Sequence, residues 1–379
     1  MITLNRRTLT VLAAAILASA ASMPSWAQAV KPIIIGQTAT LTGQLSFANI
    51  DVNRGIQAHF DEINAKGGIR GRPLRFVSLE DQADPEKAKA NFKQLVSESG
   101  AVAMLATGGT VVTAALIPLA NENKIPILAP VTGADQLRAA NNPYVFHLRA
   151  SYGTELARIA EQLSIIGQKK VAVVHSDNVF GKGATAGFLQ LAKARGLEVI
   201  PISVGDSPEE ALKGTKALLS ADAAAIVSLY ASPSINGVEV VRAYRKERPN
   251  TPWYTISLLG SRSVVEALGS SAPGMTISQV MPYPFNGTTP IVSDYLAAMK
   301  KTKDSSASHN SLEGYIAAQI LTNALKIVGK DPTGEKIALA LESKKIDLGG
   351  FDITYTSTNH NGSRYTDLVI VGSRGNLIR

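Results

Sequence analysis

Short runs of β-branched residues alternate with longer amphipathic stretches along most of the chain. Residues 33–35 form such a run and stop at Gly36, as a buried parallel strand does. Residues 51–65 then repeat apolar side chains every three or four positions, which is the spacing of a helix with one buried face. Strands that alternate with helices need crossover connections, so the pattern predicts an α/β fold with helices covering mostly parallel sheets on both sides.

The alternation occurs twice, which predicts two α/β units of similar size. The first unit runs to about residue 148 and the second from there to about residue 257. The pattern then changes to helices expected at 291–300, 312–328 and 335–342, followed by short strands at 351–354 and 367–371. Because no long linker separates the units, we expect two lobes joined by short connections.

The first 27 residues have the features of a signal peptide. Arg6 and Arg7 precede an apolar run at residues 9–21, and the small-x-small pattern allows cleavage after Ala27 or Ala29. The run is too short to cross a bilayer as a helix. We therefore expect residues 1–27 to be removed and the mature chain to be exported to the periplasm, with the export route, Sec or Tat, left open.

Composition excludes several classes of function. The 379 residues include no cysteine, which rules out disulfides, thiolate metal sites and a lipid attached through cysteine. The formal net charge is +8, but the basic residues are spread singly and in pairs, so we expect no nucleic-acid partner. The chain has no P-loop, G-x-S-x-G or H-E-x-x-H motif, and its five histidines are far apart in sequence. We expect no metal, no cofactor and no catalytic residue, and an enzyme such as a hydrolase is the weaker hypothesis.

Loops rich in glycine, serine and threonine follow several of the expected strands, for example at residues 107–110 and 130–133. Open parallel sheets bind ligands at this edge. Backbone N–H groups at a helix start and nearby hydroxyls suit a carboxylate. A threonine at a helix start is also an ordinary N-cap, so for Thr110 both interpretations stay open.

Residues 62–71 (Glu-Ile-Asn-Ala-Lys-Gly-Gly-Ile-Arg-Gly) are the most specific part of a resemblance that covers the mature chain, with support from residues 81–85, 125–130 and 175–181. The chain resembles the branched-chain amino-acid (Leu/Ile/Val-binding) type of periplasmic substrate-binding proteins of ABC transporters. The resemblance implies a type I periplasmic binding fold, in which two Rossmann-like lobes are joined by three crossover strands, here near residues 147–149, 280–282 and 349–352. The implied lobes are 30–148 plus 281–350 and 149–280 plus 351–379.

The resemblance also implies a function. The chain would be a monomeric receptor that closes on a small carboxylate ligand, either an amino acid or an apolar or aromatic acid, and delivers it to an ABC permease in the inner membrane. A ligand-sensing module for a membrane signalling partner would use the same cleft, and the sequence does not separate the two roles.

The resemblance assigns ligand-binding roles to particular residues. Thr110 would hold the ligand carboxylate, and the aromatic Phe180 and Tyr230 would close over the ligand from the second lobe. Phe47 is an aromatic candidate in the first loop, for which packing in the core is an equal alternative. The remaining candidates are neighbouring or backbone contacts at Gly109, Thr113, Val131, Thr132 and Gly133.

One position departs from the family pattern. Branched-chain receptors pair the ligand ammonium with an acid after the strand expected at 252–256, where this chain has Ser257, which is itself a ligand-binding candidate, and Leu258. An unpaired buried ammonium is costly. Either another acid replaces it, with Asp81, Asp177 and Glu313 as candidates, or the ligand has no ammonium group.

Overall fold

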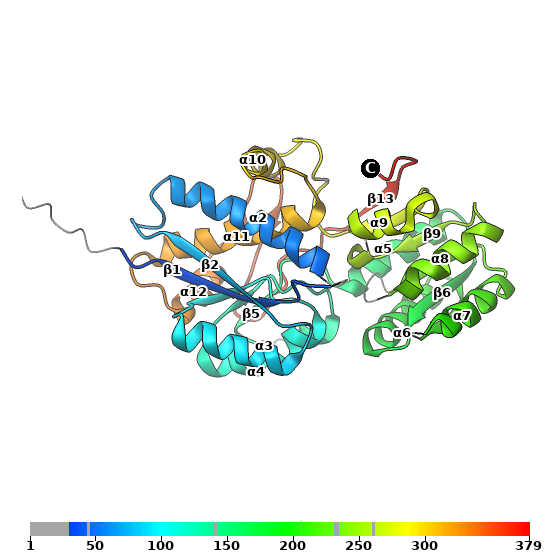
Figure 1. The fold of residues 1–379 in the computed structure, drawn as a ribbon, viewed down its shortest axis with the longest axis horizontal. Coiled ribbons are helices and arrows are strands. Elements are labelled where there is room, and N and C mark those ends of the chain that lie inside the picture. The colour runs from blue at the N-terminus through cyan, green and yellow to red at the C-terminus, as the bar shows by residue number, and fades with distance from the viewer. Residues whose placement is uncertain (1–29, 44–45, 139–141, 206, 231–234, 260–261) are drawn as a thin grey trace, which may run out of the picture.

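The computed structural model describes residues 30–43, 46–138, 142–205, 207–230, 235–259 and 262–379; the expected signal peptide lies outside these ranges. The described chain forms two bodies, each built on one sheet (Figure 1). We call the body with the five-stranded sheet the first lobe and the body with the seven-stranded sheet the second lobe. The predicted α/β fold with two parallel sheets is confirmed.

The first lobe has an all-parallel sheet in the order β2-β1-β3-β4-β5. Apolar side chains of α2, α10, α11 and α12 cover one face of it, and those of α3 and α4 cover the other. The strands are β1 (Ile33–Ala39), β2 (Leu74–Glu80), β3 (Ala103–Leu105), β4 (Ile127–Leu128) and β5 (Val145–Phe146). The helices are α2 (Ser46–Ala65), α3 (Pro85–Lys93), α4 (Thr110–Asn123), α10 (Pro290–Met299), α11 (His309–Val328) and α12 (Gly334–Glu342).

The second lobe has a sheet in the order β14-β13-β10-β9-β8-β6-β7, in which only β13 and β14 run antiparallel to their neighbours. Helices α5 and α6 pack on one face, and α7, α8 and α9 on the other. The strands are β6 (Lys170–Ser176), β7 (Glu198–Val204), β8 (Ala225–Leu229), β9 (Trp253–Thr255), β10 (Met275–Gln279), β13 (Asp367–Val371) and β14 (Leu377–Ile378). The helices are α5 (Tyr152–Ile165), α6 (Val179–Lys193), α7 (Pro208–Ser220), α8 (Ile235–Glu247) and α9 (Arg262–Leu268).

Helices α2 and α11 lie unusually close together in the first lobe. A Cβ atom on Gly55 would lie 1.8 Å from the carbonyl oxygen of Ser311, and one on Gly314 would lie 1.9 Å from that of Val52. Only glycine permits this approach of the two backbones. The helices run parallel, so both begin at the edge of the sheet where the strands end.

The chain passes between the lobes three times, and one passage differs from the expectation. The first follows β5 and the second follows β10. The third does not lie at residues 349–352, because Phe351, Ile353 and Tyr355 are buried in the core of the first lobe. The third passage comes after the short strand pair β11 (Ile346–Asp347) and β12 (Asp352–Ile353), and the chain joins the second sheet only at β13.

Most predicted helices and strands are present, with ends displaced by a few residues. The prediction missed β10, a strand inside the second sheet whose sequence Met-Thr-Ile-Ser-Gln mixes polar and apolar residues. Among the described helices, none combines the length and the apolar character needed to span a membrane.

Candidate ligand-binding site

Two hydroxyls, those of Thr110 and Thr132, meet at the edge of the first lobe. The Oγ1 atoms of Thr110 and Thr132 are 2.7 Å apart, and Thr132 Oγ1 also accepts a hydrogen bond from the N–H of Ala134 at 3.1 Å. The N-cap of α4 is Gly109, with φ of 74°, and no side chain caps the helix. Thr110 is therefore not the N-cap, and the free N–H groups of the first turn add partial positive charge beside the two hydroxyls.

Other predicted contacts of this edge are used within the protein. Thr113 is buried, and its Oγ1 lies 3.2 Å from that of Thr107. The N–H of Val131 donates to the carbonyl of Thr107 at 2.9 Å, and the N–H of Thr132 donates to that of Pro130 at 2.8 Å. These hydrogen bonds fix the shape of the loop. The half-buried Thr110 presents its hydroxyl at this edge.

Gly133 brings the second lobe against this loop. Its carbonyl accepts from the N–H of Tyr152 at 2.7 Å, and a Cβ atom on Gly133 would lie 2.6 Å from the Tyr152 ring. Tyr152 in turn meets the half-buried Phe180 edge to face, with ring centroids 5.3 Å apart. The structure thus places Phe180 near the first-lobe loop through Tyr152, a residue that the sequence prediction missed although it is the first aromatic after the first crossing.

The two remaining aromatic candidates differ in exposure. Tyr230 is buried in the core of the second lobe, its hydroxyl has no hydrogen-bond partner among the described residues, and burial raises its pKa. Phe47 is 47% exposed in the first turn of α2, so it is not a core phenylalanine. Val111 in α4 and Val179 in α6 are 61% and 80% exposed, so apolar side chains at helix starts of both lobes face solvent.

The three acids considered for a ligand ammonium are each engaged elsewhere. Asp81 is buried and accepts from the hydroxyls of Thr38 and Thr40 and from the N–H of Ala83. The ion-pair partner of Asp177 is Lys182, at 2.7 Å. Glu313 forms a buried two-point ion pair with Arg149, with Nε–Oε1 at 2.8 Å and Nη2–Oε2 at 2.5 Å.

Beside Ser257, the structure places an acid that the sequence prediction missed. Glu155 of α5 is fully buried and accepts from the N–H of Ser257 at 2.7 Å and from its hydroxyl at 2.9 Å. Burial raises the pKa of Glu155 to about 7, against the opposing effects of the Ser257 hydrogen bonds and the Arg149 charge. Ser257 therefore holds a protein carboxylate, and no local sequence signal joins two residues that lie 102 positions apart.

A cavity of about 840 Å³ lies between the lobes, beside α9 and the start of α11. Its lining contains none of the residues predicted from the sequence. The lining residues are Val265, Glu266, Gly269, Ser270, Tyr283, Phe285, Ser306, Ala307, Ser308, His309, Ser373, Arg374, Gly375, Asn376 and Leu377.

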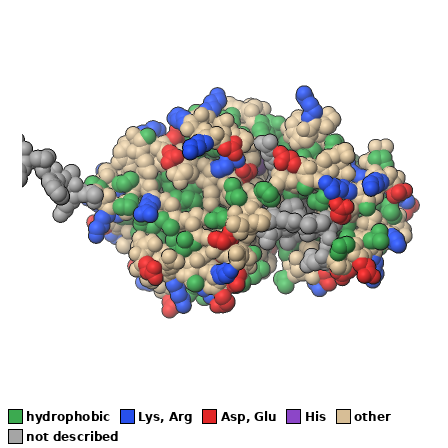
Figure 2. Space-filling view, viewed as in Figure 1, with side chains coloured by type: hydrophobic (Ala, Val, Ile, Leu, Met, Phe, Trp, Pro, Cys, Tyr) green, Lys and Arg blue, Asp and Glu red, His purple; other side chains and the backbone are tan. Residues whose placement is uncertain are grey.

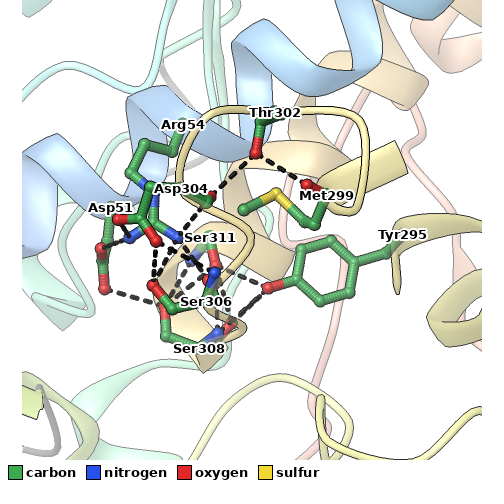
Figure 3. Close-up of polar contacts among 9 residues, drawn as sticks. All are labelled: Asp51, Arg54, Tyr295, Met299, Thr302, Asp304, Ser306, Ser308 and Ser311. Carbon is green, nitrogen blue, oxygen red and sulfur yellow. Dashed lines mark hydrogen bonds and ion pairs between the residues drawn. The ribbon is translucent and has the colours of Figure 1, made fainter. Parts of the chain in front are cut away.

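A polar network holds the first-lobe wall of this cavity in place (Figure 3). Arg54 of α2 pairs with Asp51 at 2.7 Å and with Asp304 at 3.1 Å, and donates to the carbonyl of Ser306. Ser308 caps α11 and donates to Asp51 at 2.8 Å. The loop before α11 is thereby tied to α2.

The charged side chains on one face of the molecule are mixed in sign. Figure 2 shows basic and acidic side chains interspersed over one face, with no stripe of one sign. Within the described ranges, no group of histidine and acidic residues is arranged to hold a metal ion.

The sequence profile of the periplasmic binding protein family matches residues 32–376. The chain belongs to this family. Among curated relatives, it is 22% identical to Leu/Ile/Val-binding protein homolog 3 of Brucella melitensis, over 89% of this chain and 90% of that one. It is 26% identical to the Leu/Ile/Val-binding protein BraC3 of Rhizobium johnstonii, over 93% and 94%. This periplasmic binding protein is thus a ligand receptor and not an enzyme.

Solved structures share the fold of this periplasmic binding protein. An extracellular ligand-binding receptor from Verminephrobacter eiseniae superposes with a TM-score of 0.82 at 24% identity, covering 92% of this chain and 100% of that one. A Thermus thermophilus branched-chain amino acid ABC transporter protein with bound valine gives 0.80 at 18% identity, over 92% and 95%. A solute-binding protein from R. palustris in complex with benzoate gives 0.79 at 19%, over 92% and 95%. At these identities the likeness establishes the type I fold alone.

Proposed function

We propose that this protein is a periplasmic receptor that closes on a small carboxylate-bearing ligand and delivers it to an ABC importer. The moving bodies are residues 30–148 plus 281–355 and residues 149–280 plus 356–379, because side chains of residues 351–355 are buried in the core of the first lobe. The family match supports the periplasmic location and the transport role, because relatives and structural neighbours carry names of binding proteins of this kind.

The hydroxyl pair at the uncapped start of α4 carries the proposal. Thr110 and Thr132 bring two hydroxyl oxygens to within 2.7 Å of each other, next to backbone N–H groups that no side chain caps. Hydroxyl and N–H donors around a partial positive charge suit a carboxylate. The contact between Thr110 and Thr132 includes no acidic side chain that would repel an anionic group.

The state of the acids favours an apolar or aromatic acid over an amino acid. Asp177 and Glu313 are paired with basic residues, and Asp81 and Glu155 are enclosed by hydrogen bonds, so each of these carboxylates already has its partners. An ammonium placed near them would compete with contacts inside the protein. Closure around an apolar ligand would instead bury the exposed apolar side chains of Phe47, Val111 and Val179 away from water.

A thermal-shift titration of the mature chain tests the proposal. Phenylacetate, leucine, succinate and phenylacetamide are compared, and a bound carboxylate raises the unfolding temperature with concentration, as RT ln(1 + [L]/Kd) requires. Thr110→Val reduces the rise, because the carboxylate loses a donor worth about 1.5–3 kcal/mol. Thr358→Val, at an exposed loop position, leaves it unchanged.

A flat response to every carboxylate, with stabilisation by amides or polyamines, contradicts the proposal. A response to leucine alone contradicts the preference for a ligand without an ammonium group. Delivery to an importer is measured separately, as uptake of the labelled ligand by cells that lack and then regain the gene.

A further inference from the structure

The cavity between the lobes differs in chemistry from the hydroxyl edge at α4. Three aromatic rings line it and meet edge to face: Tyr283 and Phe285 with centroids 5.1 Å apart, and His309 at 6.3 Å and 6.0 Å from them. Phe285 is nevertheless 44% exposed. A large aromatic side chain that leaves this much surface uncovered inside a cavity offers a ring-sized contact to a ligand.

The cavity lining contains one basic side chain, Arg374, one acidic side chain, Glu266, and one histidine, His309. Arg374, in the hairpin between β13 and β14, is exposed and has no ion-pair partner among the described residues. His309 is buried in the wall, and its Nε2 has no hydrogen-bond partner in the described part of the chain. Burial lowers the pKa of His309 to about 3, so the ring is neutral at pH 7 and adds no charge to the cavity wall.

Both lobes build the cavity, and its walls are held in place. Tyr283 donates from its hydroxyl to the carbonyl of Leu377 at 2.7 Å, which ties the aromatic pair to the second-lobe hairpin. This hairpin lies against α9, where Gly375 approaches Val265 (Figure 1). The opposite wall, residues 306–309, belongs to the first lobe and is anchored by Arg54 (Figure 3).

We infer that this cavity is a second binding pocket, for an aromatic carboxylate whose ring packs on Tyr283 and Phe285 and whose carboxylate pairs with Arg374. A volume of about 840 Å³ is in the range of pockets that enclose ligands of two or more rings. Because its walls come from different lobes, an occupant contacts both and stabilises one arrangement of the lobes over others.

Calorimetric titration of the mature chain with 2-naphthoate tests the inference. Phe285→Leu keeps an apolar side chain but removes the ring, and weakens binding at least fivefold. Arg374→Gln weakens binding about threefold and removes its salt dependence, and Arg374→Lys restores both. Leu339→Ala and Lys330→Gln, exposed positions outside the cavity lining, serve as matched controls and change the affinity less than twofold. Both test positions are exposed, so the variants fold, which circular dichroism verifies.

The ligand series and one further variant separate this pocket from the site at α4. The neutral 2-naphthamide binds more weakly than the acid to the wild type, and Arg374→Gln abolishes that difference. Thr110→Val acts only on a carboxylate bound at the α4 edge, and Phe285→Leu acts only on a ligand in the cavity. The inference is overturned if the wild type does not bind 2-naphthoate, or if Phe285→Leu has no effect. If Thr110→Val weakens 2-naphthoate binding and Phe285→Leu does not, the ligand occupies the α4 edge, so the inference is overturned and the receptor function proposed for that edge stands.

Discussion

Replacing Glu313 by glutamine tests whether this acid is a structural partner of Arg149 or a ligand contact. The two side chains form a two-point ion pair and are each only 3% exposed. Burial disfavours the charged guanidinium, but the adjacent Glu313 carboxylate outweighs it and raises the pKa of Arg149. The glutamine variant therefore keeps the charge of Arg149 and removes its compensation.

The expected loss of unfolding free energy is about 3–5 kcal/mol, the usual cost of leaving one charge of a buried pair unpaired. The Nη1 atom of Arg149 lacks a hydrogen-bond partner among the described residues, so the guanidinium relies on Glu313 for the two side-chain hydrogen bonds of its Nε and Nη2. An exposed pair provides the comparison. Lys124 and Glu335 are 2.6 Å apart but more than half exposed, so Glu335→Gln costs about 0–1 kcal/mol.

Urea unfolding of the ligand-free mature chain, followed by circular dichroism, measures both variants. The double variant Arg149→Met with Glu313→Leu removes both charges and recovers most of the stability that the single change loses, since apolar replacement of a buried pair is often neutral or stabilising. A loss below 1 kcal/mol for Glu313→Gln refutes the structural role. If that small loss came with abolished leucine binding, Glu313 would be the ammonium partner.

Three further changes have outcomes that the structure sets. Between about pH 4.5 and 7, Glu155 keeps a proton in the folded protein that it has released in the unfolded chain. Its contribution to stability therefore falls as pH rises through this window. Relative to Glu155→Gln, the wild type loses about 3 kcal/mol of unfolding free energy in urea titrations from pH 4.5 to 8. Gly55→Ala destabilises the protein by about 1–3 kcal/mol, because the backbone of α11 leaves no room for a Cβ atom. Gly187→Ala in α6 has open space around it and stabilises by up to about 1 kcal/mol. Equal melting temperatures for the two variants would contradict this prediction. Tyr230→Phe leaves stability unchanged or raises it, since the hydroxyl has no partner among the described residues; a loss above about 1 kcal/mol would reveal a bond to that hydroxyl.

Local pattern was enough to predict most helices and strands, because the spacing of apolar residues reports which face of an element is buried. It failed at β10, where Thr276, Ser278 and Gln279 break the apolar run although the strand lies inside the sheet. The family resemblance implied a third crossing at residues 349–352, but the structure places Phe351 and Ile353 in the first-lobe core, so the chain crosses later.

The structure brings some of the predicted site residues together and places others apart. Thr110 and Thr132 are brought together because parallel strands end at one edge, which the order of elements already implies. Tyr230 follows its strand as expected, but its side chain enters the core, and the alternation of side chains across a strand cannot be read reliably at its last residue.

From the sequence alone, the fold class, the two-lobed organisation and the membership of a receptor family could be predicted, because all of these depend on the order of elements and on short motifs. The tertiary structure decided which side chains pair with the buried acids. Glu313 meets Arg149 across 164 positions and Ser257 meets Glu155 across 102, and the aromatic cavity joins segments from α9, the start of α11 and the C-terminal hairpin. Such pairings are made by the packing of distant segments, and packing is a property of the whole chain rather than of any window within it.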